Sequence, residues 1–102
     1  MGLKKESVLL LMKEGLREPF NGRIITLGRQ DVLVTHEELI ELANQVNYPL
    51  RLLSDVELSD KLDMRKLQCI SDRSLFFMLG FDDIKSVDFS SYENADVIYD
   101  LN

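Results

Sequence analysis

Two short apolar runs near the carboxyl end of the sequence most constrain its fold, because an aspartate closes each of them. Asp88 closes the run that begins at Ile84, and Asp100 closes the run that begins at Ala95. Short apolar runs of this kind are typical of buried strands in a parallel α/β sheet. Ligands bind such sheets at the carboxyl ends of the strands, so both carboxylates are predicted to lie at a binding edge.

The preceding residues add helices and one more strand. Apolar residues at helical spacing predict a helix over residues 4–16, with Gly15 and Pro19 marking its end. Its apolar face consists of Val8, Leu11, Met12 and Leu16. The β-branched run at residues 23–27 is followed by Gly28 and is predicted to be a buried strand.

Capping signals predict where further helices begin. Thr35 and Glu38 match a capping box, and a helix is expected to follow them. The apolar stripe of this helix consists of Leu39, Leu42, Ala43 and Val46. Residues 54–57 match a second capping box, which would open a short helix that runs to Leu62.

The next predicted helix begins at Ser71 or Asp72, and its body at residues 75–79 is apolar nearly all round. Such a helix is covered on more than one side. We therefore expect three large side chains to be mostly buried, those of Phe76, Phe77 and Leu79. The alternation of helices and strands predicts one α/β domain over residues 1–102 with a parallel sheet.

Composition argues against several classes of function. The chain of 102 residues carries a net charge of −6, which argues against binding to the phosphates of nucleic acid. No apolar run is long enough to cross a bilayer, so no membrane partner is expected. Cys69 is the single cysteine, which favours a buried thiol and a reducing, cytoplasmic location. The sequence shows no Cys/His cluster that would hold a metal ion.

Gly28 and Arg29 follow the predicted strand at residues 23–27. A glycine at this place lets the chain turn sharply and lets a ligand come close to the backbone. Two interpretations stay open: the floor of a nucleotide pocket, with Arg29 and Gln30 at its mouth, or an ordinary tight turn. A single glycine favours the ordinary turn, since the sequence contains no glycine-rich phosphate loop.

The two strand-end acids also have two interpretations each. Asp88 either accepts hydrogen bonds from the two hydroxyls of a ribose or caps the turn at Ser90. Asp100 either binds an exocyclic amine, with Leu101 offering an amide and an apolar surface to a base, or belongs to a frayed terminus. No nucleophile or acid is placed by the sequence to make His36 catalytic, so no catalytic residue is assigned.

Four segments of the sequence form a set: Leu27-Gly28-Arg29-Gln30, Leu79-Gly80-Phe81, Val87-Asp88-Phe89-Ser90 and the stretch from Tyr92 to Asn102. Together they resemble the amino-terminal part of a bacterial family of class I S-adenosylmethionine-dependent methyltransferase-like proteins. The resemblance implies a partial doubly wound, Rossmann-like parallel sheet whose first strand lies at residues 23–27. It also implies that the helix at residues 4–16 is an addition to this fold and that the domain is incomplete in this chain.

The same resemblance implies a set of cofactor-binding residues, which are Gly28, Arg29, Asp88, Asp100 and Leu101. Asp88 would hold the ribose of S-adenosylmethionine, and Asp100 and Leu101 would lie beside its adenine. The sequence departs from the family pattern in the first loop, where Arg29 and Gln30 replace the usual second and third glycines.

The expected function is therefore the cofactor-binding half of a methyltransferase whose methyl acceptor is unknown. Methyl transfer from a sulfonium requires positioning rather than a metal ion or a nucleophile. The alternative is a non-enzymatic α/β module that acts through protein contacts. If the chain ends at Asn102, its last strand is a bare edge, and a homo-oligomer is expected to bury the run at residues 97–99.

Overall fold

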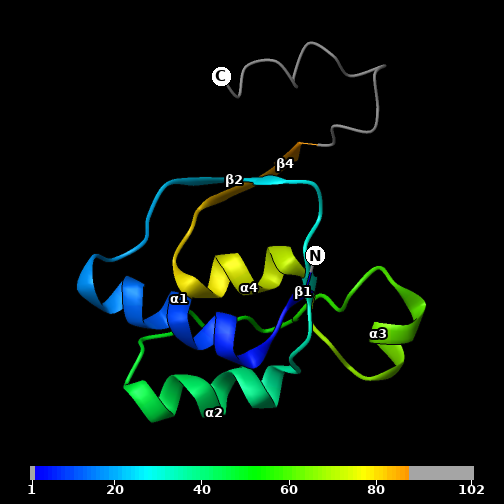
Figure 1. Ribbon diagram of the computed structural model, residues 1–102, viewed down its shortest axis with the longest axis horizontal. Coiled ribbons are helices and arrows are strands. Elements are labelled where there is room, and N and C mark those ends of the chain that lie inside the picture. The colour runs from blue at the N-terminus through cyan, green and yellow to red at the C-terminus, as the bar shows by residue number, and fades with distance from the viewer. Residues whose placement is uncertain (1, 88–102) are drawn as a thin grey trace.

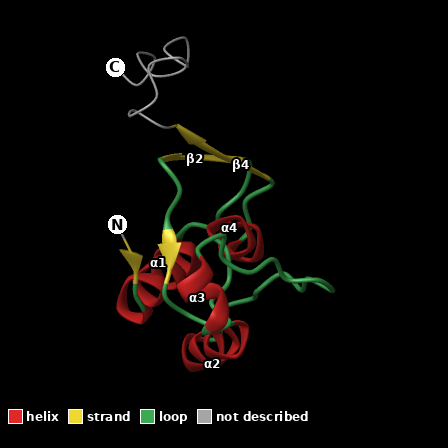
Figure 2. Ribbon diagram, turned by 90° about the vertical axis from the view of Figure 1, so that its right-hand side faces the viewer, coloured by secondary structure: helices red, strands yellow, loops and turns green. Residues whose placement is uncertain are grey.

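The computed structural model describes residues 2–87 as an α/β domain (Figure 1). Within these residues, four helices accompany two parallel sheets of two strands each (Figure 2). The helices are α1 (Lys5–Arg17), α2 (His36–Val46), α3 (Leu62–Lys66) and α4 (Asp72–Leu79). The strands are β1 (Gly2–Leu3), β2 (Arg23–Leu27), β3 (Asp31–Val32) and β4 (Asp83–Val87). The α/β class predicted from the sequence is confirmed.

Both sheets are parallel. The alternation of strands and helices predicts this direction for β2 and β4, whereas the β1–β3 sheet was not predicted. β2 and β4 pair along their whole lengths, from Arg23 opposite Asp83 to Leu27 opposite Val87. β1 and β3 pair with each other in a separate sheet. The described residues therefore place the strands in two small sheets rather than in one doubly wound sheet.

The β2–β4 sheet lies at one end of the described part of the molecule, and α2 lies at the other (Figure 1). α4 lies beneath one face of this sheet, and no described element covers the opposite face (Figure 2). Ile24 packs against the core, whereas the next residue, Ile25, is 51% exposed. The prediction of a buried strand at residues 23–27 thus holds for one face only, because the described chain covers one side.

The core lies between α1, α2, α4 and β3. Its largest fully buried side chains are Val8, Met12, Val32, Val34, Leu39, Ile70, Leu75 and Met78. Cys69 is also buried, as predicted, and burial raises the pKa of its thiol. Within residues 2–87, no helix combines the length and the apolar character needed to cross a bilayer.

The helix predicted over residues 4–16 is present as α1, but it continues through Gly15 to Arg17. The prediction that Gly15 ends the helix is therefore wrong. Gly15 is buried, and a Cβ atom built on it would stand 2.8 Å from the hydroxyl oxygen of Tyr48. The missing side chain lets α1 approach Tyr48. Leu16, expected on the apolar face, is instead 44% exposed, because the core side of this turn is occupied by Gly15.

The capping box at the start of α2 is confirmed. The Thr35 hydroxyl accepts a hydrogen bond from the Glu38 amide at 3.1 Å, and the Glu38 carboxylate accepts one from the Thr35 amide at 2.9 Å. The same carboxylate lies 2.8 Å from the ammonium group of Lys5, so it also links α2 to α1. The predicted stripe faces the core, with Leu39, Leu42 and Ala43 buried and Val46 half-buried.

The second predicted capping box, at residues 54–57, does not open a helix, and α3 begins only at Leu62. The Glu57 carbonyl accepts hydrogen bonds from the Ser71 amide at 2.9 Å and from the Ser74 hydroxyl at 3.0 Å. These bonds tie the Glu57 backbone to the start of α4. The tertiary contact therefore replaces the local helix that the sequence predicts.

α4 begins after Ser71, whose hydroxyl caps its first turn, as the sequence predicts. Phe76 and Leu79 are buried as expected, with 4% and 3% of their surface exposed. Phe77 is less completely buried, and the guanidinium carbon of Arg51 lies 4.9 Å from the centre of its ring. The expectation of a mostly buried side chain is met less fully by Phe77 than by Phe76 and Leu79, and Arg51 covers part of its ring.

Candidate functional site

The turn that follows β2 contains two of the predicted cofactor-binding residues, Gly28 and Arg29. The Gly28 amide donates a hydrogen bond of 2.6 Å to the carbonyl of Val87, so the turn lies directly beside the end of β4. Gly28 has a φ of +74°, a left-handed conformation that favours glycine. Among residues 2–87, no atom lies within 4 Å of a Cβ atom built at this position. Backbone conformation rather than crowding by these residues thus calls for glycine, and residues 2–87 leave the space beside it open.

Side chains on both sides of Gly28 hold the turn in place. The Thr26 hydroxyl donates a hydrogen bond to the Gly28 carbonyl at 2.9 Å. The Gln30 side-chain amide donates to the same carbonyl at 3.3 Å. The Gly28 peptide is therefore held through its carbonyl as well as through its amide.

Arg29 is anchored to Asp72, the first residue of α4. The Arg29 Nη2 atom donates to Asp72 Oδ1 at 2.7 Å, and Arg29 Nε lies 3.0 and 3.1 Å from the two carboxylate oxygens. A third guanidinium nitrogen, Nη1, donates to the exposed carboxylate of Asp60 at 2.8 Å. The position of Arg29 is thus explained by ion pairs within the protein.

The Asp72 carboxylate also binds the backbone. It accepts a hydrogen bond from the Gln30 amide at 2.8 Å and another from the Arg73 amide at 2.9 Å. Only 2% of the Asp72 side chain is exposed. One buried carboxylate therefore joins the turn after β2 to the first turn of α4.

The charges at this contact stabilise each other. Burial of the Asp72 carboxylate favours its neutral form, but the hydrogen bonds from Arg29 and from the Gln30 amide outweigh burial and hold the Asp72 pKa below its usual value. The hydrogen bond to Asp72 raises the pKa of Arg29 in turn. Asp72 is therefore an anion, and Arg29 a cation, at neutral pH.

A small cavity of about 100 Å³ lies between the β2–β4 sheet and the start of α4. Its lining residues are Thr26, Arg29, Asp72, Arg73, Ile84 and Ser86. Ligand pockets commonly measure roughly 300–1,000 Å³. The described residues around this cavity are therefore too close together to enclose a nucleoside.

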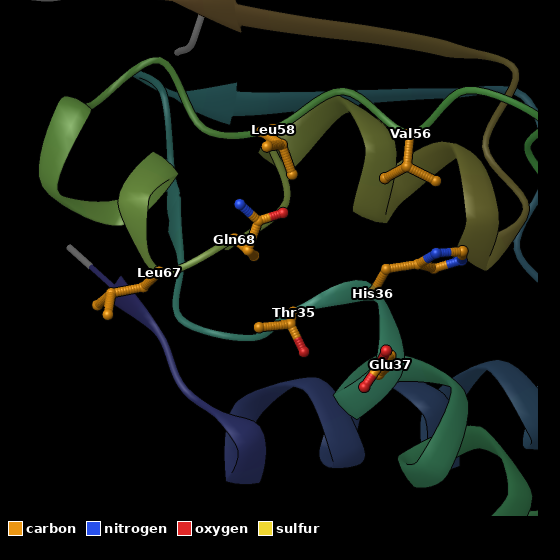
Figure 3. Close-up of a pocket in the computed structure, with 7 residues that line it drawn as sticks. All are labelled: Thr35, His36, Glu37, Val56, Leu58, Leu67 and Gln68. Carbon is orange, nitrogen blue, oxygen red and sulfur yellow. The ribbon is translucent and has the colours of Figure 1, made fainter.

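A larger pocket of about 500 Å³ lies where the start of α2 meets the chain around α3 (Figure 3). Its lining residues are Thr35, His36, Glu37, Val56, Leu58, Leu67 and Gln68. In Figure 3, Val56 and Leu58 point into the pocket, whereas Glu37 and Leu67 turn away from its centre. Neither Gly28 nor Arg29 is among these lining residues, and the polar side chains labelled in Figure 3 do not converge on one point. Within residues 2–87, no group of three His, Cys, Asp or Glu side chains could hold a metal ion.

The structure thus brings Gly28 and Arg29 to the carboxyl end of the β2–β4 sheet. The other three predicted cofactor residues, Asp88, Asp100 and Leu101, lie outside the described residues, as does the run at residues 97–99 that was predicted to be an edge strand. Sequence reasoning treated Asp72 only as a helix cap and missed its contact with Arg29. The two residues lie 43 positions apart, so no local pattern indicates that they meet.

Comparison of the chain with protein-family models, with curated proteins and with solved structures found no match.

Proposed function

We propose that this chain is the cofactor-binding part of an S-adenosylmethionine-dependent methyltransferase that acts on an unidentified methyl acceptor. The observation that carries the proposal is the parallel pairing of β2 with β4, which ends with Leu27 opposite Val87. Gly28 and Asp88 are the next residues along the sequence. Neighbouring parallel strands of a doubly wound sheet bring their carboxyl ends to one edge, where nucleotide cofactors bind.

Four of the five predicted cofactor residues have a proposed task in binding the cofactor, whereas Arg29 pairs with Asp72 and Asp60. Gly28 offers a backbone surface that no side chain of residues 2–87 covers. The Asp88 carboxylate accepts hydrogen bonds from the ribose hydroxyls, and Asp100 and Leu101 bind the adenine. The bound cofactor supplies an electrophilic methyl group, so the remaining task of the protein is to position this group against the acceptor.

The proposal assigns β2 to the interior of a larger doubly wound sheet. The first strand of such a sheet has neighbours on both sides and helices over both faces. β4 provides one neighbour, and α4 lies over one face. Ile25, 51% exposed, lies on the face that the described residues leave open, and it would be covered by the rest of the sheet's helices.

The test is calorimetric titration with S-adenosylhomocysteine, using the protein translated from the whole reading frame that contains this sequence. We expect binding, and we expect Asp88→Ala to weaken it by about one to two orders of magnitude. This range corresponds to the loss of hydrogen bonds to a charged group, about 1.5–3 kcal/mol.

Asp83→Asn is the matched control, because Asp83 stands at the other end of the strand that precedes Asp88. Its carboxylate pairs with Arg23 at 2.7 Å, and both side chains are exposed. We expect this variant to bind as the unmodified protein does. Absence of binding by the unmodified protein, or equal binding by Asp88→Ala, contradicts the proposed function.

A further inference from the structure

The contact between Asp72 and the turn after β2 reaches the backbone next to the proposed cofactor residue. Asp72 accepts a hydrogen bond from the Gln30 amide at 2.8 Å, two residues beyond Gly28. The Gln30 side chain in turn donates to the Gly28 carbonyl at 3.3 Å. The carboxylate is therefore linked to the Gly28 peptide through one residue.

This link matters for binding because it restrains a turn that contains glycine. Glycine adopts many backbone conformations, so an unrestrained turn loses entropy when a ligand orders it. A turn that is already held in one conformation avoids that loss, and binding becomes tighter. The φ angle of Gly28 is held at +74°, and the described part of the chain leaves the space beside its Cα atom open.

Asp60 shows how the Asp72 contact differs from an ordinary ion pair. Both carboxylates bind the Arg29 guanidinium, at 2.8 Å for Asp60 and 2.7 Å for Asp72. The Asp60 side chain is 64% exposed, whereas that of Asp72 is 2% exposed and also binds the turn's backbone. Exposed ion pairs contribute little because water screens them.

We propose that Asp72, through Arg29 and the Gln30 amide, is a positioning residue that fixes the turn at Gly28 for the cofactor. This inference rests on the proposed function, since it assigns the turn to the S-adenosylmethionine site. Asp72 itself stays within the protein and touches no ligand. It supplies the rigidity that a turn with one glycine and two long polar residues needs for binding.

The test compares Asp72→Asn with Asp60→Asn in the protein translated from the whole reading frame. Two quantities are measured: hydrogen exchange of the Gln30 amide by NMR and the affinity for S-adenosylhomocysteine by calorimetry. For Asp72→Asn we expect the Gln30 amide to exchange about tenfold faster and S-adenosylhomocysteine to bind about tenfold more weakly. The reason is that the Gln30 amide and Arg29 lose a charged hydrogen-bond acceptor. For Asp60→Asn we expect both quantities to stay within about twofold, as for a surface substitution.

Two further variants separate positioning from stability. Arg29→Lys keeps the positive charge but loses the forked geometry, so it tests the same contact if Asp72→Asn does not fold. We expect it to speed Gln30 exchange and weaken binding in the same direction. Leu39→Ala removes a fully buried side chain in α2, outside the turn. It is expected to lower stability and to leave the affinity of the folded protein within about twofold, since distant sites act independently.

The outcomes distinguish this inference from the proposed function. Unchanged Gln30 exchange in Asp72→Asn and in Arg29→Lys overturns the positioning role. Faster exchange with unchanged affinity also overturns it, because the turn is then not part of the cofactor site. Absence of binding by the unmodified protein overturns the proposed function and the inference with it. Two results together support both proposals: the unmodified protein and Asp60→Asn bind with similar affinity, and Asp72→Asn shows faster Gln30 exchange with binding about tenfold weaker.

Discussion

At the scale of single residues, Asp72 shows how partners keep a buried charge in place. Its carboxylate is almost fully enclosed, and yet its pKa lies below the usual value because Arg29 and two backbone amides donate to it. A depressed pKa means that the folded state binds a proton less readily than the unfolded chain does. The contact therefore stabilises the fold while Asp72 is charged.

We predict a pH-dependent difference in unfolding free energy between the unmodified protein and Asp72→Asn. The difference is expected to be constant above about pH 5, where Asp72 is charged in both folded and unfolded chains. It should shrink as the pH falls below about 4, because the unfolded carboxyl group protonates first. Urea titrations of both proteins between about pH 7 and pH 3 measure this difference in unfolding free energy. If the difference in unfolding free energy grows as the pH falls, the assignment of Asp72 as an anion is contradicted.

At the scale of elements, α4 shows that an apolar run does not by itself decide which side chains are buried. Phe76 is 4% exposed, and its ring meets that of Phe81 edge to face, with centroids 6.2 Å apart. Phe77, the next residue, is half-buried beneath Arg51. Both are phenylalanines in one helix, so they form a matched pair for a stability measurement.

We predict that Phe76→Ala lowers the free energy of unfolding by about 3–5 kcal/mol, the range for a buried aromatic side chain. Phe77→Ala should cost clearly less, because part of its ring is already in contact with water and the contact with Arg51 is worth about 0.5–1 kcal/mol. Urea titration of the two variants and of the unmodified protein measures both losses of unfolding free energy. Equal losses would show that Phe77 becomes covered in the whole protein.

At the scale of the whole molecule, the open face of the β2–β4 sheet is the feature that the proposed function must account for. Thr26 lines the cavity next to α4, so Ile25, one position earlier, lies on the opposite face. A sheet of only two strands is marginally stable in water. Two explanations account for this face: further strands and helices of the same protein cover it, or a second copy of the chain does. Only the second makes the unfolding midpoint depend on protein concentration.

We predict that Ile25→Ala lowers the unfolding free energy of the protein from the whole reading frame by about 2–3 kcal/mol, as for a buried side chain. Leu52→Ala is the control, since Leu52 is 88% exposed. It should change stability by less than about 0.5 kcal/mol. Light scattering is expected to show a monomer, with an unfolding midpoint independent of protein concentration.

A dimer whose unfolding midpoint rises with protein concentration would favour the alternative, a non-enzymatic module that self-associates. If Ile25→Ala lowers the unfolding free energy by less than about 1 kcal/mol, the loss is no larger than strand propensity alone explains. This result would show that the face stays uncovered, and it would contradict the doubly wound sheet.

Features that depend on neighbouring residues could be predicted from the sequence. The capping box of Thr35 and Glu38 joins residues three positions apart, and β2 follows from one β-branched run. The parallel direction of β2 and β4 could be predicted from the order of strands and helices, although the order does not say that these two strands pair. Gly28 could be placed at the end of a strand because it directly follows the β-branched run, although its hydrogen bond to Val87 could not be foreseen.

Other features were decided by tertiary contacts. Gly15 carries a local signal for a helix end, but the approach of Tyr48 makes it an interior position of α1. Residues 54–57 carry a local signal for a helix start, but Ser71 and Ser74 bind the Glu57 carbonyl instead. The sequence by itself determined the α/β class and the starts of α2 and α4, because those signals act within one or two turns. Only the tertiary structure brought Asp72 to Arg29, since a contact across 43 residues exists only once the core between them has packed.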